Sequence, residues 1–184
     1  MAGLTAIYRR FAASTRGVAA IEFATILPVL LLLFLASIDA GRAIAIYLKV
    51  RAATYTLDAI TNQYTTIQST DMTSILGATS VVLSPYSASP VVVTVSQFAI
   101  NSSSQATVSW SATLNGTALT TGSSVSVPSG FANPNSYVIQ GQVSYTYTPM
   151  FVFFIKNAIT LSDSLYVTPR SSRCIVYVPV SSSC

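Results

Sequence analysis

One long apolar segment constrains this chain more than any other feature of its sequence. Residues 18–38 read VAAIEFATILPVLLLLFLASI, and Glu22 is the only charged residue among them. A helix of this length spans about 31 Å, close to the thickness of the hydrocarbon core of a bilayer. The segment is also longer than the roughly 7–15 apolar residues of a signal-peptide core. We therefore predict a retained transmembrane helix over residues 18–38.

A cleaved secretory signal is the alternative interpretation of this region. Three arginines (Arg9, Arg10 and Arg16) precede the apolar segment, and the triplet Ala43-Ile44-Ala45 offers a cleavage site. That triplet lies beyond two charged residues, which favours the anchor. Basic residues stand on both sides of the segment, so the positive-inside rule barely distinguishes the two orientations. The large downstream domain and its cysteines favour a cytoplasmic N-terminus.

The distribution of charge excludes several classes of function. Charged residues make up 8% of the chain, and none occurs in the 84 residues between Asp71 and Lys156. The chain has no histidine, which removes imidazole metal sites and histidine-based catalytic triads. The nine basic residues are too scattered to form a nucleic-acid-binding surface. We expect no catalytic centre, no metal or other cofactor, no nucleic-acid partner and no small-molecule substrate.

A helical pattern continues beyond the apolar segment, over residues 39–68. Apolar residues recur there at steps of three and four, which places them on one face of an amphipathic helix. These residues are Ile46, Val50, Ala53, Leu57, Ile60, Tyr64 and Ile67, with Arg51, Asp58 and Thr65 opposite. We expect this face to pack on the protein's own sheet; a coiled-coil partner is the alternative. Within the apolar segment, Pro28 lacks an amide donor and should kink or loosen the helix.

Residues 69–184 carry the signals of a β-rich domain. A short helix or capped turn is expected over residues 69–77, with Asp71 near its start. Runs of β-branched and alternating residues predict strands at 91–100, 107–114, 136–148, 165–168 and 174–178. Asn115-Gly116 indicates a type I′ hairpin that returns through residues 117–121. Short connections favour an antiparallel sheet, so the chain as a whole is predicted to be α+β.

The only two cysteines, Cys174 and Cys184, stand near the C-terminal end of the sequence. An even number of cysteines in an exported domain suggests a disulfide that ties the last residues back to the domain. Two free thiols are the alternative.

The start of the apolar segment resembles a known export signal. A basic leader over residues 1–17 ends in Gly17, and Glu22-Phe23 follows at the head of the helix. This arrangement resembles the class III signal of type IV prepilins, which a membrane aspartyl peptidase cleaves after the glycine. The resemblance implies a mature chain that begins at Val18. The carboxylate of Glu22 could then pair with the new α-ammonium group of a neighbouring subunit, compensating a charge that would otherwise be buried alone.

A wider set of motifs resembles the TadE-like pseudopilins of Flp/Tad tight-adherence pili. The matching elements are Gly17, Glu22-Phe23, Leu27-Pro28 and Asp39-Ala40-Gly41-Arg42, with further likeness at residues 143–149 and 159–163. The resemblance implies a pilin-like fold, with the long helix packed on an antiparallel sheet. Major Flp pilins are much shorter than this chain, which implies a minor pilin or pseudopilin that takes part in pilus assembly.

The same resemblance implies partners and a location. The partners would be the prepilin peptidase, other Tad pilins or pseudopilins, the inner-membrane assembly platform and the lipid bilayer. The protein would cross the bacterial inner membrane once, with residues 69–184 in the periplasm. Two other functions stay open from the sequence: an unprocessed bitopic envelope protein with a β-rich binding domain, and a secreted adhesin released by signal peptidase.

Overall fold

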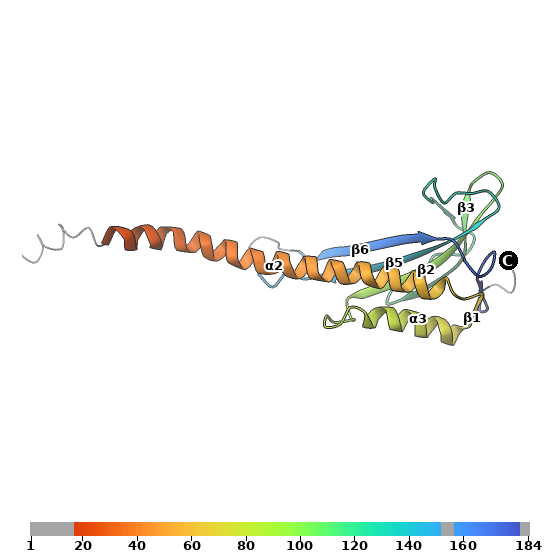
Figure 1. The fold of residues 1–184 in the computed structure, drawn as a ribbon, viewed down its shortest axis with the longest axis horizontal. Coiled ribbons are helices and arrows are strands. Elements are labelled where there is room, and N and C mark those ends of the chain that lie inside the picture. Colours follow the sequence, from red (N-terminus) through yellow and green to blue (C-terminus); the bar gives the residue numbers. More distant parts are fainter. Residues whose placement is uncertain (1–16, 152–156, 181–184) are drawn as a thin grey trace, which may run out of the picture.

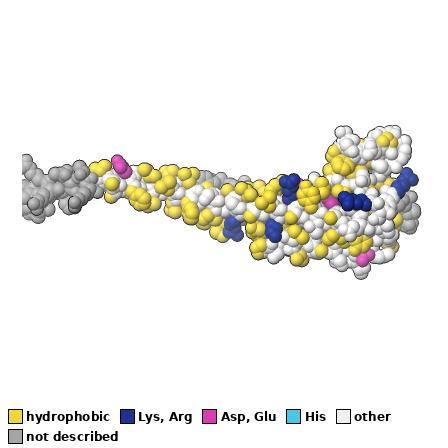
Figure 2. Space-filling model, viewed as in Figure 1, with side chains coloured by type: hydrophobic (Ala, Val, Ile, Leu, Met, Phe, Trp, Pro, Cys, Tyr) yellow, Lys and Arg dark blue, Asp and Glu magenta, His cyan; other side chains and the backbone are white. Residues whose placement is uncertain are grey.

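The computed structural model describes residues 17–151 and 157–180, and it has an α+β fold. Helix α2 (Val18–Thr61) runs without interruption from the N-terminal end of the described chain into the β-sheet domain. Figure 1 shows its first part, residues 18–38, projecting away from the domain; we call this part the stalk. Hydrophobic side chains cover most of the stalk in Figure 2. The expected α+β architecture, a long apolar helix joined to an antiparallel sheet, is confirmed.

The domain is built on a five-stranded antiparallel sheet with the strand order β4-β3-β2-β5-β6. These strands are β2 (Val91–Ile100), β3 (Ala106–Leu114), β4 (Ser124–Val125), β5 (Tyr137–Tyr147) and β6 (Ile159–Val167). A second, two-stranded parallel sheet joins β1 (Thr66–Ile67) to β7 (Val176–Tyr177). The strand expected over residues 165–168 is thus the end of a longer strand.

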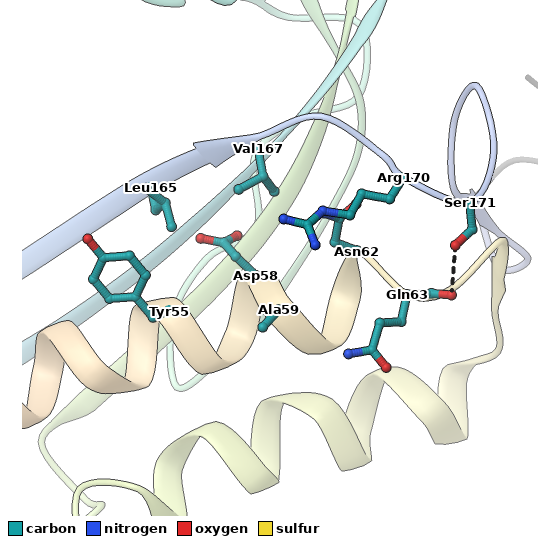
Figure 3. Close-up of a pocket in the computed structure, with 9 residues that line it drawn as sticks. All are labelled: Tyr55, Asp58, Ala59, Asn62, Gln63, Leu165, Val167, Arg170 and Ser171. Atoms are coloured by element: carbon teal, nitrogen blue, oxygen red, sulfur yellow. Dashed lines mark hydrogen bonds between the residues drawn. The ribbon is translucent and has the colours of Figure 1, made fainter.

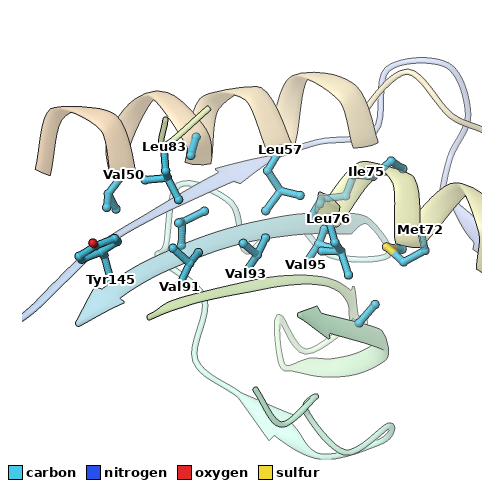
Figure 4. Packing of buried hydrophobic residues seen from close by; sticks show 14 of the residues in the cluster. Val50, Leu57, Met72, Ile75, Leu76, Leu83, Val91, Val93, Val95 and Tyr145 are labelled. Atoms are coloured by element: carbon cyan, nitrogen blue, oxygen red, sulfur yellow. The ribbon is translucent and has the colours of Figure 1, made fainter. Parts of the chain in front are cut away.

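Two helices cover one face of the large sheet. The second half of α2 lies over β5 and β6, and α3 (Ser69–Val81) lies over β2 and β3. The main core fills the space between these layers (Figure 4). Alternating residues of β2 (Val91, Val93 and Val95) point into it because the side chains of a strand alternate between the two faces. The buried hydrophobic residues that α2 contributes to this core all belong to the face predicted from its periodicity: Ile46, Val50, Ala53 and Leu57. The amphipathic face of α2 therefore packs on the protein's own sheet.

The opposite face of the sheet is polar and carries no charge over its central strands. Hydroxyl groups pair across β2 and β3, with Thr94 Oγ1 3.1 Å from Thr113 Oγ1 and Ser96 Oγ 2.8 Å from Ser111 Oγ. A small second core lies where the segment after β3 returns over the sheet, and Phe98, Val108 and Val138 are buried there.

The long helix ends earlier than its sequence pattern predicts. It stops at Thr61 rather than near Gln68. The residues that follow form turns, in which the backbone amides of Gln63 and Tyr64 donate hydrogen bonds to the carbonyls of Ile60 and Thr61. The residues after this turn enter β1, which needs an extended backbone to pair with β7. Helix α3 then begins with a reciprocal capping box, in which the Asp71 carboxylate accepts a hydrogen bond from the Gln68 amide at 3.1 Å.

The hairpin predicted at Asn115-Gly116 is wrong. Asn115 has a positive φ of 57°, but Gly116 does not, so the two residues do not form a type I′ turn. The Asn115 side-chain amide instead donates to the carbonyl of Val91 at 3.0 Å, which anchors the chain to β2. The chain leaves the sheet at this point, and the strand that pairs with β3 is β4, at residues 124–125.

Candidate functional site: the N-terminal helix and its junction with the sheet

The residues predicted for processing and assembly all lie on the exposed stalk. Gly17 is the N-cap of α2, and a Cβ atom built there would meet no atom within 4 Å. Val18 is the first residue of the helix and is 53% exposed. Glu22 and Phe23 follow one turn later and are exposed as well. Within the described residues, the structure brings none of these four into contact with the β-sheet domain.

The stalk has the properties of a membrane segment. Its helix is the one described helix that is long and apolar enough to cross a bilayer, and none of its most apolar stretch is buried inside the protein. The exposed side chains include Ile21, Leu27, Leu31 and Phe34. Exposing so many large apolar side chains to water is unfavourable, which fits an apolar surrounding.

The two hydroxyl side chains within the stalk satisfy their hydrogen bonds inside the helix. Thr25 Oγ1 donates to the carbonyl of Glu22 at 2.8 Å, and Ser37 Oγ donates to the carbonyl of Phe34 at 2.7 Å. Pro28 lies inside the helix, which continues on both sides of it. Its ring removes the amide that would normally bond the carbonyl of Ala24, so the predicted loosening has a local cause.

Asp39 marks the junction between the stalk and the sheet, and its role was not predicted from the sequence. Its side chain is only 6% exposed. The backbone amides of Met150 and Phe151 donate to its two carboxylate oxygens at 3.0 and 2.9 Å. The Tyr147 hydroxyl, at the end of β5, donates to Asp39 Oδ1 at 3.3 Å. The carboxylate therefore joins the helix to the chain that follows β5.

Electrostatics at this junction favour the ionised carboxylate. Burial acts to raise the pKa of Asp39, but the hydrogen bonds from Phe151, Met150 and Tyr147 and the nearby Arg42 charge outweigh it, so the pKa is lowered. Arg42 also reaches the loop, with Nη1 3.7 Å from the sulfur of Met150. The Asp39-Ala40-Gly41-Arg42 motif thus has a structural reason: its acid and its base both contact the segment after β5. The motif was visible in the sequence, but its partner segment stands more than 100 residues away.

The end of α2 holds a second feature that the helical pattern misplaced. Asp58 was predicted to lie opposite the packed face, yet it is buried, with 2% of its surface exposed. The reason lies in β5, where Gly141 leaves room for the carboxylate. A Cβ atom at position 141 would lie 2.8 Å from Asp58 Cγ and 2.9 Å from Oδ2.

The predicted disulfide cannot be placed on the described residues. Cys174 is buried next to Ile175, near the Trp110 side chain, whose Nε1 donates to the carbonyl of Ile175 at 2.8 Å. Cys184 lies outside the described residues, as does the leader over residues 1–16. The pairing of Cys174 with Cys184 therefore stays a prediction.

The fold and this site define a class: an α+β protein in which one apolar helix, which fits a membrane anchor, continues into an antiparallel sheet domain. Residues 17–56 match the model of the family described as TadE-like protein. The match begins at Gly17 and includes the junction motif, whereas the β-sheet domain lies outside it. It confirms the resemblance indicated by the sequence motifs that lie within residues 17–56. No curated protein and no solved structure matches the chain.

Proposed function

We propose that this protein is a minor pilin or pseudopilin that takes part in the assembly of a Flp/Tad pilus after prepilin peptidase cleavage between Gly17 and Val18. The observation that carries the proposal is the TadE-like match, which begins at the proposed cleavage site and covers the exposed apolar helix. The function is one of protein contacts, in keeping with a family whose members are generally structural.

The geometry of the cleavage site supports processing. Gly17 lies at the boundary of the helix, and no described side chain shields it. A peptidase must bind an extended, accessible backbone, and glycine imposes the least steric restriction on such binding. Cleavage would remove Arg9, Arg10 and Arg16 and would leave a positive α-ammonium group at the start of the helix.

Glu22 is the residue proposed for pairing between subunits. It is exposed on the stalk, and no described residue forms an ion pair with it. A carboxylate within an apolar helix is costly in a membrane or a packed filament unless a cation compensates it. The α-ammonium group of a neighbouring processed subunit supplies that cation, and Phe23 would pack beside the pair.

The proposal includes a topology and a set of partners. The N-terminus is cytoplasmic, residues 18–38 cross the bacterial inner membrane, and residues 69–184 lie in the periplasm. The partners are the prepilin peptidase, other Tad pilins or pseudopilins and the assembly platform in the inner membrane. In the oxidising periplasm, Cys174 and Cys184 would form a disulfide.

The N-terminal sequence of the protein from its native host tests the proposal. A mature chain that starts at Val18 supports it. An intact leader would favour an unprocessed bitopic envelope protein, and a start near Ile46 would favour a secreted adhesin released by signal peptidase. Either of these two results would overturn the proposed maturation.

Two glycine variants sharpen this test. Gly17→Ala should block cleavage, so that the longer precursor accumulates on a gel. Gly41→Ala is the matched control, because Gly41 lies inside the same helix and a Cβ atom added to it would meet no atom within 4 Å, so this variant should be processed normally. Normal maturation of Gly17→Ala would contradict the assignment to a prepilin peptidase.

A further inference from the structure

The pocket beside the C-terminal end of α2 contains buried acceptor atoms that no described residue satisfies. It has a volume of about 400 Å³ and lies between α2, β6 and the segment that follows β6. Both carboxylate oxygens of Asp58 and Oδ1 of Asn62 are buried there, and none of the three makes a hydrogen bond of good geometry with a described residue, although the Gly141 amide is close enough to act on the Asp58 carboxylate. Buried polar groups are normally paired, so these three atoms require an explanation.

The charges around Asp58 are unbalanced. Asp163, on β6, faces the same region and adds negative charge. The last turn of α2 has no basic residue, and the C-terminal end of a helix is itself electronegative. The strand directly against Asp58 contributes Gly141, which carries no charge. An ionised Asp58 would therefore be buried in a negative field.

Two cations lie in this part of the protein, and one of them is engaged elsewhere. The Arg51 guanidinium stands 5.9 Å from the centroid of the Tyr55 ring. The pKa of Arg51 is raised, chiefly by Tyr55 and to a smaller extent by Asp163. Arg170 is the one cation among the residues that line the pocket. It is exposed, and its guanidinium forms no hydrogen bond or ion pair with a described residue. Figure 3 shows its side chain extending across the pocket toward Asp58.

We propose that Arg170 and Asp58 form an acid-sensitive lock: the guanidinium enters the pocket and pairs with the ionised carboxylate, and it is released when that carboxylate takes up a proton. A guanidinium has a planar fork of donors that suits a carboxylate, and Asn62 Oδ1 supplies a further acceptor beside it. One guanidinium then supplies the donors that the Gly141 amide alone does not provide for these three oxygens. Burial raises the pKa of Asp58 to about 7, with Asp163 adding to the rise and the Gly141 amide opposing it, so the carboxyl group changes charge near neutral pH.

The lock would act on residues 168–175, which connect β6 to β7; we call them the strap. The strap already contacts the end of α2, where Ser171 Oγ donates to the carbonyl of Gln63 at 3.5 Å. At its far end, the Ile175 amide donates to Gln97 Oε1 at 2.7 Å. Arg170 directly precedes Ser171 in the strap and lines the pocket beside the end of α2. Closing the lock would therefore fix the strap to the helix, and acid would loosen it. The lock rests on these contacts alone and does not depend on the proposed role in a pilus.

The decisive measurement is the titration of the Asp58 carboxyl carbon by NMR, on the full-length protein in detergent micelles. With the lock present, the midpoint of wild-type Asp58 should lie about 1 pH unit below that of Arg170→Gln, a change of about tenfold in proton affinity. Arg173→Gln is the matched control. It removes the same charge from the same strap, but Arg173 donates to the carbonyl of Asn135 and does not line the pocket. Its midpoint should equal that of the wild type.

Amide hydrogen exchange of the strap provides the second readout. After correction for the intrinsic effect of pH, exchange at residues 170–172 should slow as the wild-type protein passes from pH 5 to pH 8. Asp58→Asn and Arg170→Gln should each abolish this slowing, and the double variant should behave like either single one. Equal Asp58 midpoints in wild type and Arg170→Gln would overturn the proposal, as would strap protection that stays pH-dependent in Arg170→Gln.

Discussion

The close approach of Asp58 to Gly141 leads to a quantitative prediction about how α2 packs on the sheet. Gly141 lies in the middle of β5, and its φ is not in the left-handed region, so its backbone would accept alanine. The obstacle to the substitution is the lack of space for the added Cβ atom. The new Cβ would lie 2.8 Å from Asp58 Cγ, whereas carbon atoms in contact are about 3.5–4.0 Å apart. Either Asp58 or the whole helix has to move by the better part of an ångström.

We expect Gly141→Ala to lower the free energy of unfolding by about 1–3 kcal/mol, the usual cost of one extra carbon in a packed core. In an Asp58→Ala background the obstacle is gone. There Gly141→Ala should be neutral or stabilising by up to about 1 kcal/mol, because alanine reduces the conformational entropy of the unfolded chain. The two substitutions should therefore show a coupling energy of at least about 1 kcal/mol.

Urea unfolding of the full-length protein in detergent micelles measures this coupling. Trp110 is the only tryptophan in the chain and is fully buried, so its fluorescence reports on the packed state. The matched control is Gly77→Ala in α3, where no atom lies within 4 Å of the added Cβ; it should stabilise the protein by about 0.5–1 kcal/mol. Equal destabilisation by Gly141→Ala in both backgrounds would refute the steric explanation.

Three further predictions follow from the polar contacts of the domain. The pKa of Asp58 is about 7 in the folded protein and about 3.8 in the unfolded chain, so between these values the folded protein binds the proton more tightly. The free energy of unfolding should therefore fall by up to about 4 kcal/mol as the pH rises from about 4 to about 7. Asp58→Asn should flatten this decline in pH-dependent urea titrations, and an unchanged slope would contradict the assignment. Trp110→Phe leaves the Ile175 carbonyl without its buried donor and should cost about 1–3 kcal/mol, measured by circular dichroism; Tyr177→Phe, which keeps the ring beside Trp110, should cost much less. Asp39→Ala should accelerate amide exchange at Met150 and Phe151 without changing exchange in α3, and the stability that the ionised Asp39 provides should be lost as the pH falls through its lowered pKa. Unchanged exchange at both amides would show that Asp39 does not hold this loop.

Several elements could be predicted from the sequence because their signals are local. Strand β2 begins at Val91 and ends at Ile100, as its run of β-branched residues between Pro90 and Asn101 predicts. The packed face of α2 follows from the spacing of Ile46, Val50, Ala53 and Leu57, since a helix brings such positions to one side whatever lies opposite. The motifs of residues 17–56 indicated the family whose model these residues match.

The errors arose where distant residues decide the structure. Asn115-Gly116 has the sequence of a tight hairpin, but the Asn115 side chain bonds to Val91 on the neighbouring strand and the chain leaves the sheet. Helix α2 ends at Thr61 because residues 66 and 67 pair with β7, more than 100 positions away. Neither partner is visible in the local pattern.

The candidate sites divide in the same way. The sequence by itself determined the membrane-length apolar segment, the position of Glu22 within it and the motif at Gly17 on which the proposed cleavage rests, because hydrophobicity and length are properties of a continuous segment. Only the tertiary structure decided that Asp39 holds the amides of Met150 and Phe151, and that Asp58 lies against Gly141 beside Arg170. The physical reason is that the environment of a charged side chain, and with it the pKa and the need for a partner, depends on atoms that folding brings together from distant parts of the chain.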